Sequence, residues 1–200
     1  GIELQESGEA DAFVSAGNTG AVMAAALTTL GRIKGISRPA IVTPFPTRAS
    51  PCLVLDVGAN AECKPQHLAQ FALMGHVYAA EVLGRERPRV GLLSIGEEAG
   101  KGNELTIAAH RLLAESGLNF VGNIEGRDVL GGAVDVVVTD GFTGNVLLKF
   151  GESFVDFPAG EIRRETGSSR RATLGAWLMR PTFRKLVRRI DYAEYGGAPL

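Results

Sequence analysis

Four glycine-rich stretches of the sequence combine residue types that bind small anions. They are residues 15–20, 56–60, 96–104 and 140–145. Each is expected to open a helix after a strand, where glycine lets the backbone approach a ligand and the first N–H groups of the helix are free to donate. Turn and capping chemistry alone explains any one of these stretches. Four of them together favour a site for a small anion such as phosphate.

Three charged residues within these stretches are candidates for catalysis. Lys101 is the one cation there, and it either neutralises bound phosphate or a developing oxyanion, or is a solvated surface lysine. Asp56 and Asp140 end apolar strands, where they either orient a reacting group or cap a turn. The candidates for phosphate and substrate binding are polar: Ser15, Asn18, Thr19, Asn60, Asn103, Glu104, Thr143 and Asn145.

Other kinds of site have little support in the sequence. Neither a P-loop nor a Gly-x-Gly-x-x-Gly pattern occurs, so nucleotides are not indicated. The three histidines, at positions 67, 76 and 110, fall in expected helices and show neither triad order nor zinc spacing. Cys52 and Cys63 fit no zinc motif and are expected to be reduced cytosolic thiols.

Apolar strand-like runs alternate with helical segments along the chain. Strands are expected at 12–15, 40–43, 52–58, 89–95, 119–122 and 134–139, and helices at 21–33, 65–83, 104–115 and from 145 to about 154. Continuous apolar strands are typical of a mostly parallel sheet covered on both faces. We therefore predict a three-layer α/β fold in which the loops after the strands line one edge. We expect one domain over residues 1–200, cut at both ends.

A late basic segment, residues 161–190, stands apart from the rest. Residues 161–200 hold nine Lys and Arg against four Asp and Glu, whereas residues 1–160 hold 12 against 18. This distribution argues against a general nucleic-acid surface. We expect Pro181 to interrupt the segment, as the Pro158 region interrupts the helix before it.

The apolar residues of this basic segment lie at helical spacing. Leu174, Trp177 and Leu178 form one stripe, and Phe183 begins a second one. A basic amphipathic helix with a tryptophan suits an anionic membrane surface. The alternative is a helical hairpin buried against a second subunit, which the same pattern supports equally.

Several stretches resemble the PlsX phosphate acyltransferase family. They occur in family order and cover nearly the whole chain. They are residues 15–21, 31–36 with 38–39, 55–60, 64–65 with 68–75, 90–93, 101–105, 120–123 with 125–128, 135–146, and 191–192 with 195–198. Any one stretch is weak evidence, but the set is highly specific.

The resemblance implies a three-layer α/β/α fold like that of isocitrate and isopropylmalate dehydrogenases, and usually a homodimer. It implies the conversion of acyl-ACP (acyl carrier protein) and inorganic phosphate to acyl phosphate and ACP, without a metal or organic cofactor. Lys101 matches a lysine implicated in the family's active site. The family's N-terminal Asp-Ala-Met-Gly-Gly-Asp and its later His-Gly-Ser-Ser stretch are not in this sequence, so we expect the chain to lack part of the site.

For such an enzyme we expect a cytoplasmic location with peripheral membrane association. The basic segment could dock acidic ACP. The acyl phosphate would pass to a membrane glycerol-phosphate acyltransferase in phospholipid synthesis. The alternatives are a phosphate acetyl- or butyryltransferase that uses acyl-CoA, and a non-catalytic membrane or ACP adaptor. A metal-dependent dehydrogenase of similar fold is more distant, because the sequence shows no clustered carboxylates.

Overall fold

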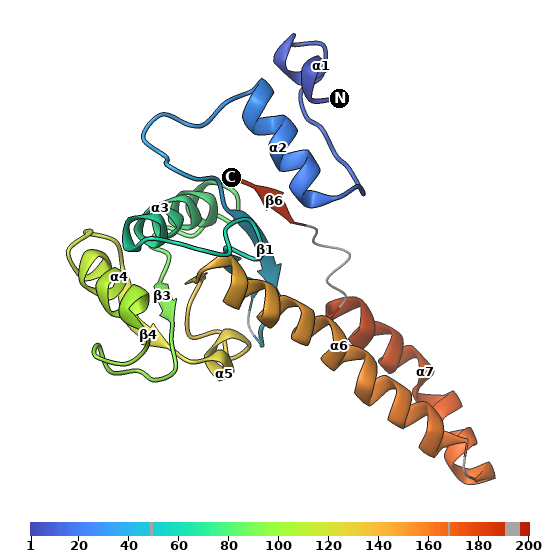
Figure 1. The fold of residues 1–200 in the computed structure, drawn as a ribbon. Coiled ribbons are helices and arrows are strands. Elements are labelled where there is room, and N and C mark those ends of the chain that lie inside the picture. The colour runs from blue at the N-terminus through green and yellow to red at the C-terminus, as the bar shows by residue number, and fades with distance from the viewer. Residues whose placement is uncertain (49, 168, 191–196) are drawn as a thin grey trace.

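The computed structural model describes residues 1–48, 50–167, 169–190 and 197–200 and has an α/β fold in three layers (Figure 1). The strands are β1 (Ile41–Phe45), β2 (Cys52–Leu55), β3 (Val90–Leu93), β4 (Phe120–Ile124), β5 (Val136–Val138) and β6 (Ala198–Pro199). The helices are α1 (Ile2–Glu6), α2 (Thr19–Thr29), α3 (Pro65–Glu81), α4 (Glu104–Ala114), α5 (Gly126–Val129), α6 (Gly141–Thr166) and α7 (Arg170–Ile190). The predicted α/β class is confirmed.

The strands form one sheet in the order β4-β3-β5-β2-β1-β6. The four strands from β4 to β2 run parallel, with Val54 beside Val137 and Leu92 beside Val138. Strand β1 pairs antiparallel with β2, and β6 antiparallel with β1. The sheet is therefore mostly parallel, as the continuous apolar strands predicted.

Helices α3 and α4 cover one face of the sheet. Their apolar side chains, among them Leu68, Phe71 and Leu113, are fully buried against alternate strand residues such as Leu53 and Val136. On the opposite face, the intervening strand residues pack with Leu147 and Leu148 of α6, Val129 of α5 and Met23 of α2. Because parallel strands need crossovers that return over a face, both faces are covered and the strands are apolar throughout.

The expected strand at residues 12–15 is wrong. This segment is irregular, and the side chain of Val14 is 93% exposed. A strand needs a neighbour to pair with, and residues 12–15 pair with none of the strands in the described sheet. An apolar run without such a neighbour does not become a strand.

The predicted helix breaks at the two prolines are also wrong. Helix α6 continues through Pro158 and α7 through Pro181. Proline removes one backbone hydrogen bond but keeps a φ that a helix tolerates, and strong helix formers such as Arg163 follow. Of the late motifs, Ser168 and residues 191–196 lie outside the described residues.

Candidate active site

The loops after β2, β3 and β5 lie at one edge of the sheet. These three strands are parallel and β5 is bonded to both of the others, so their carboxyl ends point the same way. The loops hold Asp56 to Asn60, Gly96 to Asn103, and Asp140. In open α/β sheets this edge is the usual place for a ligand. The structure thus brings three of the four glycine-rich stretches to a common edge.

Asp56 organises the first of these loops from within the protein. Its side chain is fully buried. One oxygen accepts hydrogen bonds from the backbone N–H groups of Ile41, Gly58 and Ala59, at 3.0, 3.2 and 2.9 Å. The other accepts from the backbone and side-chain amides of Asn60, at 2.7 and 2.9 Å. Both oxygens are therefore occupied, and Asp56 fixes the loop backbone.

The start of α6 lies directly against this loop. The Gly141 N–H donates to the Asn60 carbonyl at 2.8 Å, and the Asn145 side-chain amide donates to the Val57 carbonyl at 3.1 Å. A Cβ on Gly144 would collide with the carbonyl oxygen of Asp56. Glycine at position 144 is therefore required for this close approach.

Asp140 caps α6. Its carboxylate accepts from the Thr143 N–H and hydroxyl, both at 2.8 Å. A carboxylate at a helix start is stabilised by the free N–H groups there. The exposed side chains of Thr143 and Asn145 stand in the same first turn, beside the loop that Asp56 holds.

The loop after β3 carries Lys101. Its backbone is fixed, because the carbonyl of Lys101 accepts from the Ser94 hydroxyl at 3.1 Å and its N–H donates to Glu98 at 2.9 Å. The side chain is exposed. Asn103 caps α4 by accepting from the Thr106 N–H at 2.9 Å, and Glu104 lies exposed in the first turn. A fixed backbone thus presents a cation at the shared edge.

Among the described residues, no hydrogen bond joins the fourth stretch, residues 15–20, to the other three. Ser15 accepts from the Gly17 N–H at 3.0 Å, and Asn18 caps α2 by accepting from Ala21 at 3.1 Å. Both side chains and that of Thr19 are exposed. The stretch therefore caps a helix, as expected, but does not follow a strand.

Arg38 is a neighbour of the site that was not among the predicted site residues, although it belongs to one of the family-like stretches. Its guanidinium donates to the side-chain oxygen of Asn60 at 3.5 Å. Burial and then the charges of Arg38 and Lys64 lower the pKa of His67, and burial raises the pKa of the Cys63 thiol to about 11. Two signals in the sequence could have pointed to Arg38: its place directly before a proline and an expected strand, and the resemblance of residues 38–39 to the family.

Helices α6 and α7 form a long hairpin that projects from the body (Figure 1). On α7, the side chains of Leu174, Trp177 and Leu178 are 59%, 66% and 64% exposed, whereas Phe183 is half-buried. None of the described helices combines the length and apolar character that crossing a bilayer requires. The hairpin also exposes an apolar row on α6, formed by Phe142, Val146, Phe150, Phe154 and Phe157.

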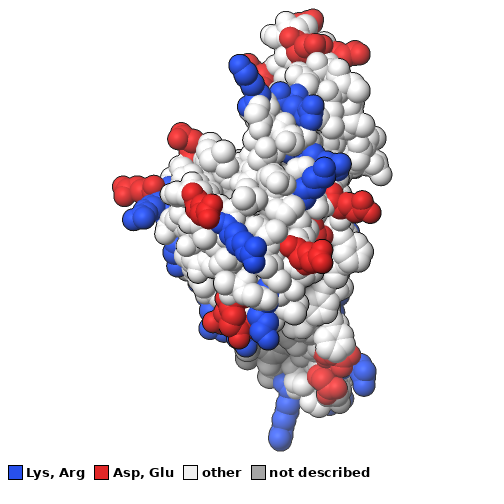
Figure 2. Space-filling model, turned by 60° about the vertical axis from the view of Figure 1, so that its left-hand side comes forward, with Lys and Arg blue, Asp and Glu red and all other residues white. Residues whose placement is uncertain are grey.

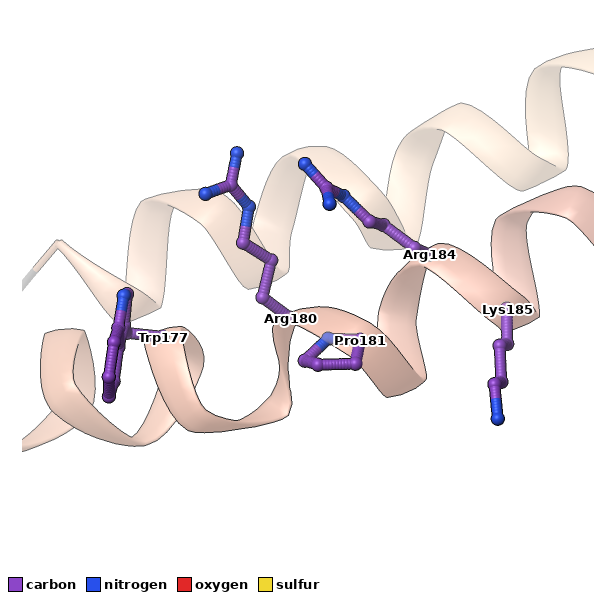
Figure 3. A pocket seen from close by; sticks show the side chains of 5 residues that line it. All are labelled: Trp177, Arg180, Pro181, Arg184 and Lys185. Carbon is purple, nitrogen blue, oxygen red and sulfur yellow. The ribbon is translucent and has the colours of Figure 1, made fainter.

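A shallow hollow of about 470 Å³ lies on α7. It is lined by Trp177, Arg180, Pro181, Arg184 and Lys185. Figure 3 shows Arg180 and Arg184 pointing to one side of the helix and Lys185 to the other. The hollow thus combines one indole with three cations of the same helix, which is a suitable surface for anionic groups.

Charges elsewhere are mixed in sign. On the face drawn in Figure 2, Lys and Arg side chains alternate with Asp and Glu, without a broad area of one sign. No three His, Cys, Asp or Glu residues gather into a metal-binding cluster in the described ranges. On this face of the molecule, charge alone does not mark out a large binding surface.

A family model described as "Fatty acid synthesis protein" matches residues 1–200. The chain belongs to this family. The phosphate acyltransferase of Heliobacterium modesticaldum is 56% identical over 197 residues, covering 98% of this chain and 59% of the relative. That of Geobacter sulfurreducens is 53% identical over 199 residues, covering 100% of this chain and 58% of the relative. The chain thus spans less than two thirds of the length of these family members.

Solved structures share the fold of this family member. The EutD phosphotransacetylase from Staphylococcus aureus has a TM-score of 0.59 at 20% identity, covering 78% of this chain and 54% of that one. A phosphotransacetylase from Streptococcus pyogenes has a TM-score of 0.62 at 18% identity, covering 77% and 54%. At these identities the likeness concerns the fold.

Proposed function

We propose that the protein takes part in transferring an acyl group from acyl-ACP to inorganic phosphate, forming acyl phosphate for phospholipid synthesis. The observation that carries this proposal is the shared edge of three glycine-rich loops in a chain 56% identical to a phosphate acyltransferase. The edge combines the starts of two helices, amide side chains and one exposed lysine. These groups suit a phosphate nucleophile.

In the proposed reaction, an oxygen of hydrogen phosphate attacks the thioester carbonyl carbon. The tetrahedral intermediate carries a negative charge on the former carbonyl oxygen. The carbon–sulfur bond then breaks, and the proton of hydrogen phosphate ends on the released thiol of ACP. Each step places negative charge at the edge, where donors fixed in advance lower the barrier most.

The geometry supports the following proposed residue roles. Lys101 is the proposed cation for phosphate or for the oxyanion, because its ammonium is exposed on a fixed loop. Asn145 at the start of α6 and Asn103 at the start of α4 are proposed phosphate donors, because each keeps a side-chain N–H that is not engaged within the protein, and Glu104 is proposed to act through its backbone N–H. Asn60 and Thr143 are proposed to shape the site, because their donor groups are engaged by Pro39, Asp56 and Asp140. Asp56 and Asp140 are proposed positioning residues, because their oxygens are engaged within the protein.

The hairpin is the proposed contact with other components. The exposed Leu174, Trp177 and Leu178, beside the cations of α7, suit an anionic membrane surface to which a cytoplasmic protein binds peripherally. Acyl phosphate is amphiphilic, so release near a membrane glycerol-phosphate acyltransferase is chemically sensible. The apolar row on α6 suits a second subunit of a homodimer. The cations also suit acidic ACP.

The test is a donor assay. Acyl phosphate formation is measured with acyl-ACP and with acyl-CoA as donors, for this chain and for a chimera extended with the flanking segments of the Heliobacterium modesticaldum relative. Product from acyl-ACP alone supports the proposal. Product from acyl-CoA alone favours a phosphotransacetylase, the rival to which the shared fold points. Retained ACP or liposome binding without turnover in the chimera favours an adaptor.

A further inference from the structure

A hollow of about 690 Å³ lies between α2, the segment after it and the loop after β2. It is lined by Met23, Leu27, Gly31, Arg32, Ser37, Arg38, Pro39, Ala59 and Asn60. Two of these nine residues are arginines and none is acidic, while Met23 and Leu27 supply an apolar wall. An occupant that matches the hollow combines a negative charge with an apolar part.

The guanidinium of Arg38 contacts the amide of Asn60 and not a carboxylate. The Asn60 side-chain oxygen accepts from its guanidinium at 3.5 Å, while the Asn60 amide nitrogen donates to Pro39 and Asp56 at 2.7 and 2.9 Å. In the described residues no carboxylate forms an ion pair with Arg38. The oxygens of Asp56 are occupied by N–H donors, so the charge of Arg38 remains available to a ligand.

The segment that carries Arg38 is anchored on both sides of this residue. The Ser37 N–H donates to the Gln70 side chain of α3 at 2.9 Å, and Gln70 donates to the Gly35 carbonyl at 3.1 Å. On the other side, Pro39 is tied to Asn60. A cation on an anchored segment loses little freedom when it binds an anion, which favours affinity.

We propose that this hollow binds the acyl phosphate product, with Arg38 holding the phosphoryl group and Met23 and Leu27 contacting the adjoining part of the acyl chain. The inference rests on the proposed function, which supplies a ligand with this combination of charge and apolar chain. The planar guanidinium matches phosphoryl oxygens, which favour two parallel hydrogen bonds. Asn60 connects this hollow to the edge where phosphate is proposed to react.

Binding of two stable phosphonates tests the proposal. Methylphosphonate and octylphosphonate are titrated calorimetrically into the wild-type chain, Arg38→Gln, Arg38→Lys and Leu27→Trp. Two controls lie outside the hollow. Lys34→Gln removes a positive charge from the neighbouring segment, and Leu30→Trp enlarges a leucine at the end of α2. Arg38→Gln should weaken both probes about tenfold or more, the size of one charge-assisted hydrogen bond. Leu27→Trp should weaken only octylphosphonate, and the controls should change little.

The proposal is overturned if Arg38→Gln binds both probes like the wild type, or if Lys34→Gln weakens binding equally. It is also overturned if the wild-type chain does not bind octylphosphonate. Arg38→Lys keeps the positive charge but loses the planar guanidinium with its two parallel hydrogen bonds. If Arg38→Gln does not fold, the affinity of Arg38→Lys for both probes is compared with that of the wild type instead. A different result would refute the proposed function alone. In that case octylphosphonate binds through Arg38, but the chimera forms no acyl phosphate.

Discussion

Asn60 donates two hydrogen bonds to one oxygen of the Asp56 carboxylate, from its backbone at 2.7 Å and from its side chain at 2.9 Å. The pair closes the loop after β2 upon itself and leaves the Asn60 oxygen to face Arg38. A buried acid thus sets the position of an amide at the candidate site. Changes to either residue should therefore affect folding and ligand binding together.

Asp56→Asn should lower the free energy of unfolding by about 3 kcal/mol or more. The variant places an NH₂ group among five N–H donors and leaves some of them without an acceptor. Urea unfolding followed by circular dichroism measures the loss. Glu62→Gln, which alters an exposed carboxylate nearby, should change stability little. Equal stability of the Asp56 variant and the wild type would contradict the structural role.

Gly144→Ala should destabilise the protein by about 3 kcal/mol, because the added methyl group collides with the Asp56 backbone. Gly160→Ala is the matched change in the same helix, where a Cβ meets open space. That variant should gain about 0.5 to 1 kcal/mol from helix propensity. The melting temperatures of both variants are compared with that of the wild type. A similar small change in melting temperature for both would show that α6 does not lie against the loop after β2.

The free energy of unfolding should fall below about pH 4, because Asp135 then loses its charge. Burial raises the pKa of Asp135, but hydrogen bonds from the Arg89 side chain and backbone outweigh this and hold the pKa below its usual value. A lowered folded pKa stabilises the protein above the unfolded pKa, and this contribution is lost as pH falls through the folded value. Asp135→Asn should therefore lose about 1 to 2 kcal/mol at pH 7 and show a flatter decline in acid.

The measurement is the free energy of unfolding in urea between pH 7 and pH 3. Asp11→Asn, at an exposed site, is the control and should follow the wild type. If the Asp135 variant has the same pH dependence as the wild type, the ion pair with Arg89 does not carry this effect.

Trp177→Glu should reduce binding to anionic liposomes in flotation experiments. The indole is 66% exposed on a helix that also carries Arg180, Arg184 and Lys185, and each cation near an anionic leaflet contributes about 1 kcal/mol. Binding should weaken with salt and be poor for neutral lipids. Thr182→Glu adds the same charge on α7 without removing the indole. Equal recovery with both lipids, or a dimer broken by Trp177→Glu in sedimentation, would instead favour an interface between subunits.

Much of the fold could be predicted from local patterns. The runs around Cys52–Leu55, Val90–Leu93 and Val136–Val138 are continuous and apolar because helices cover both faces, and each forms a strand. The run at residues 12–15 is also short and mainly apolar, but it pairs with no strand of the described sheet. Pairing depends on distant segments, so the pattern was insufficient there.

The candidate site was only partly predictable for the same reason. Glycines and amides after the strands indicated the shared edge, and Asp56 was noted as an acid at a strand end. Its complete burial depends on donors from residues 41 and 58–60, which only the fold brings together. Arg38 was missed because the hollow it lines is assembled from residues 23 to 60.

The central claim is that the edge formed by the loops after β2, β3 and β5 holds phosphate for attack on an acyl thioester. The most direct measurement is the rate of acyl phosphate formation from acyl-ACP and phosphate by the chimera, with and without Lys101→Ala. Arg111→Ala removes an exposed cation at the far end of α4 as the control. We predict product with the parent protein, a loss of about a hundredfold in kcat for Lys101→Ala at unchanged stability, and little change for the control. A folded Lys101→Ala variant with a near-normal rate, or a folded parent that forms no product, would contradict the account.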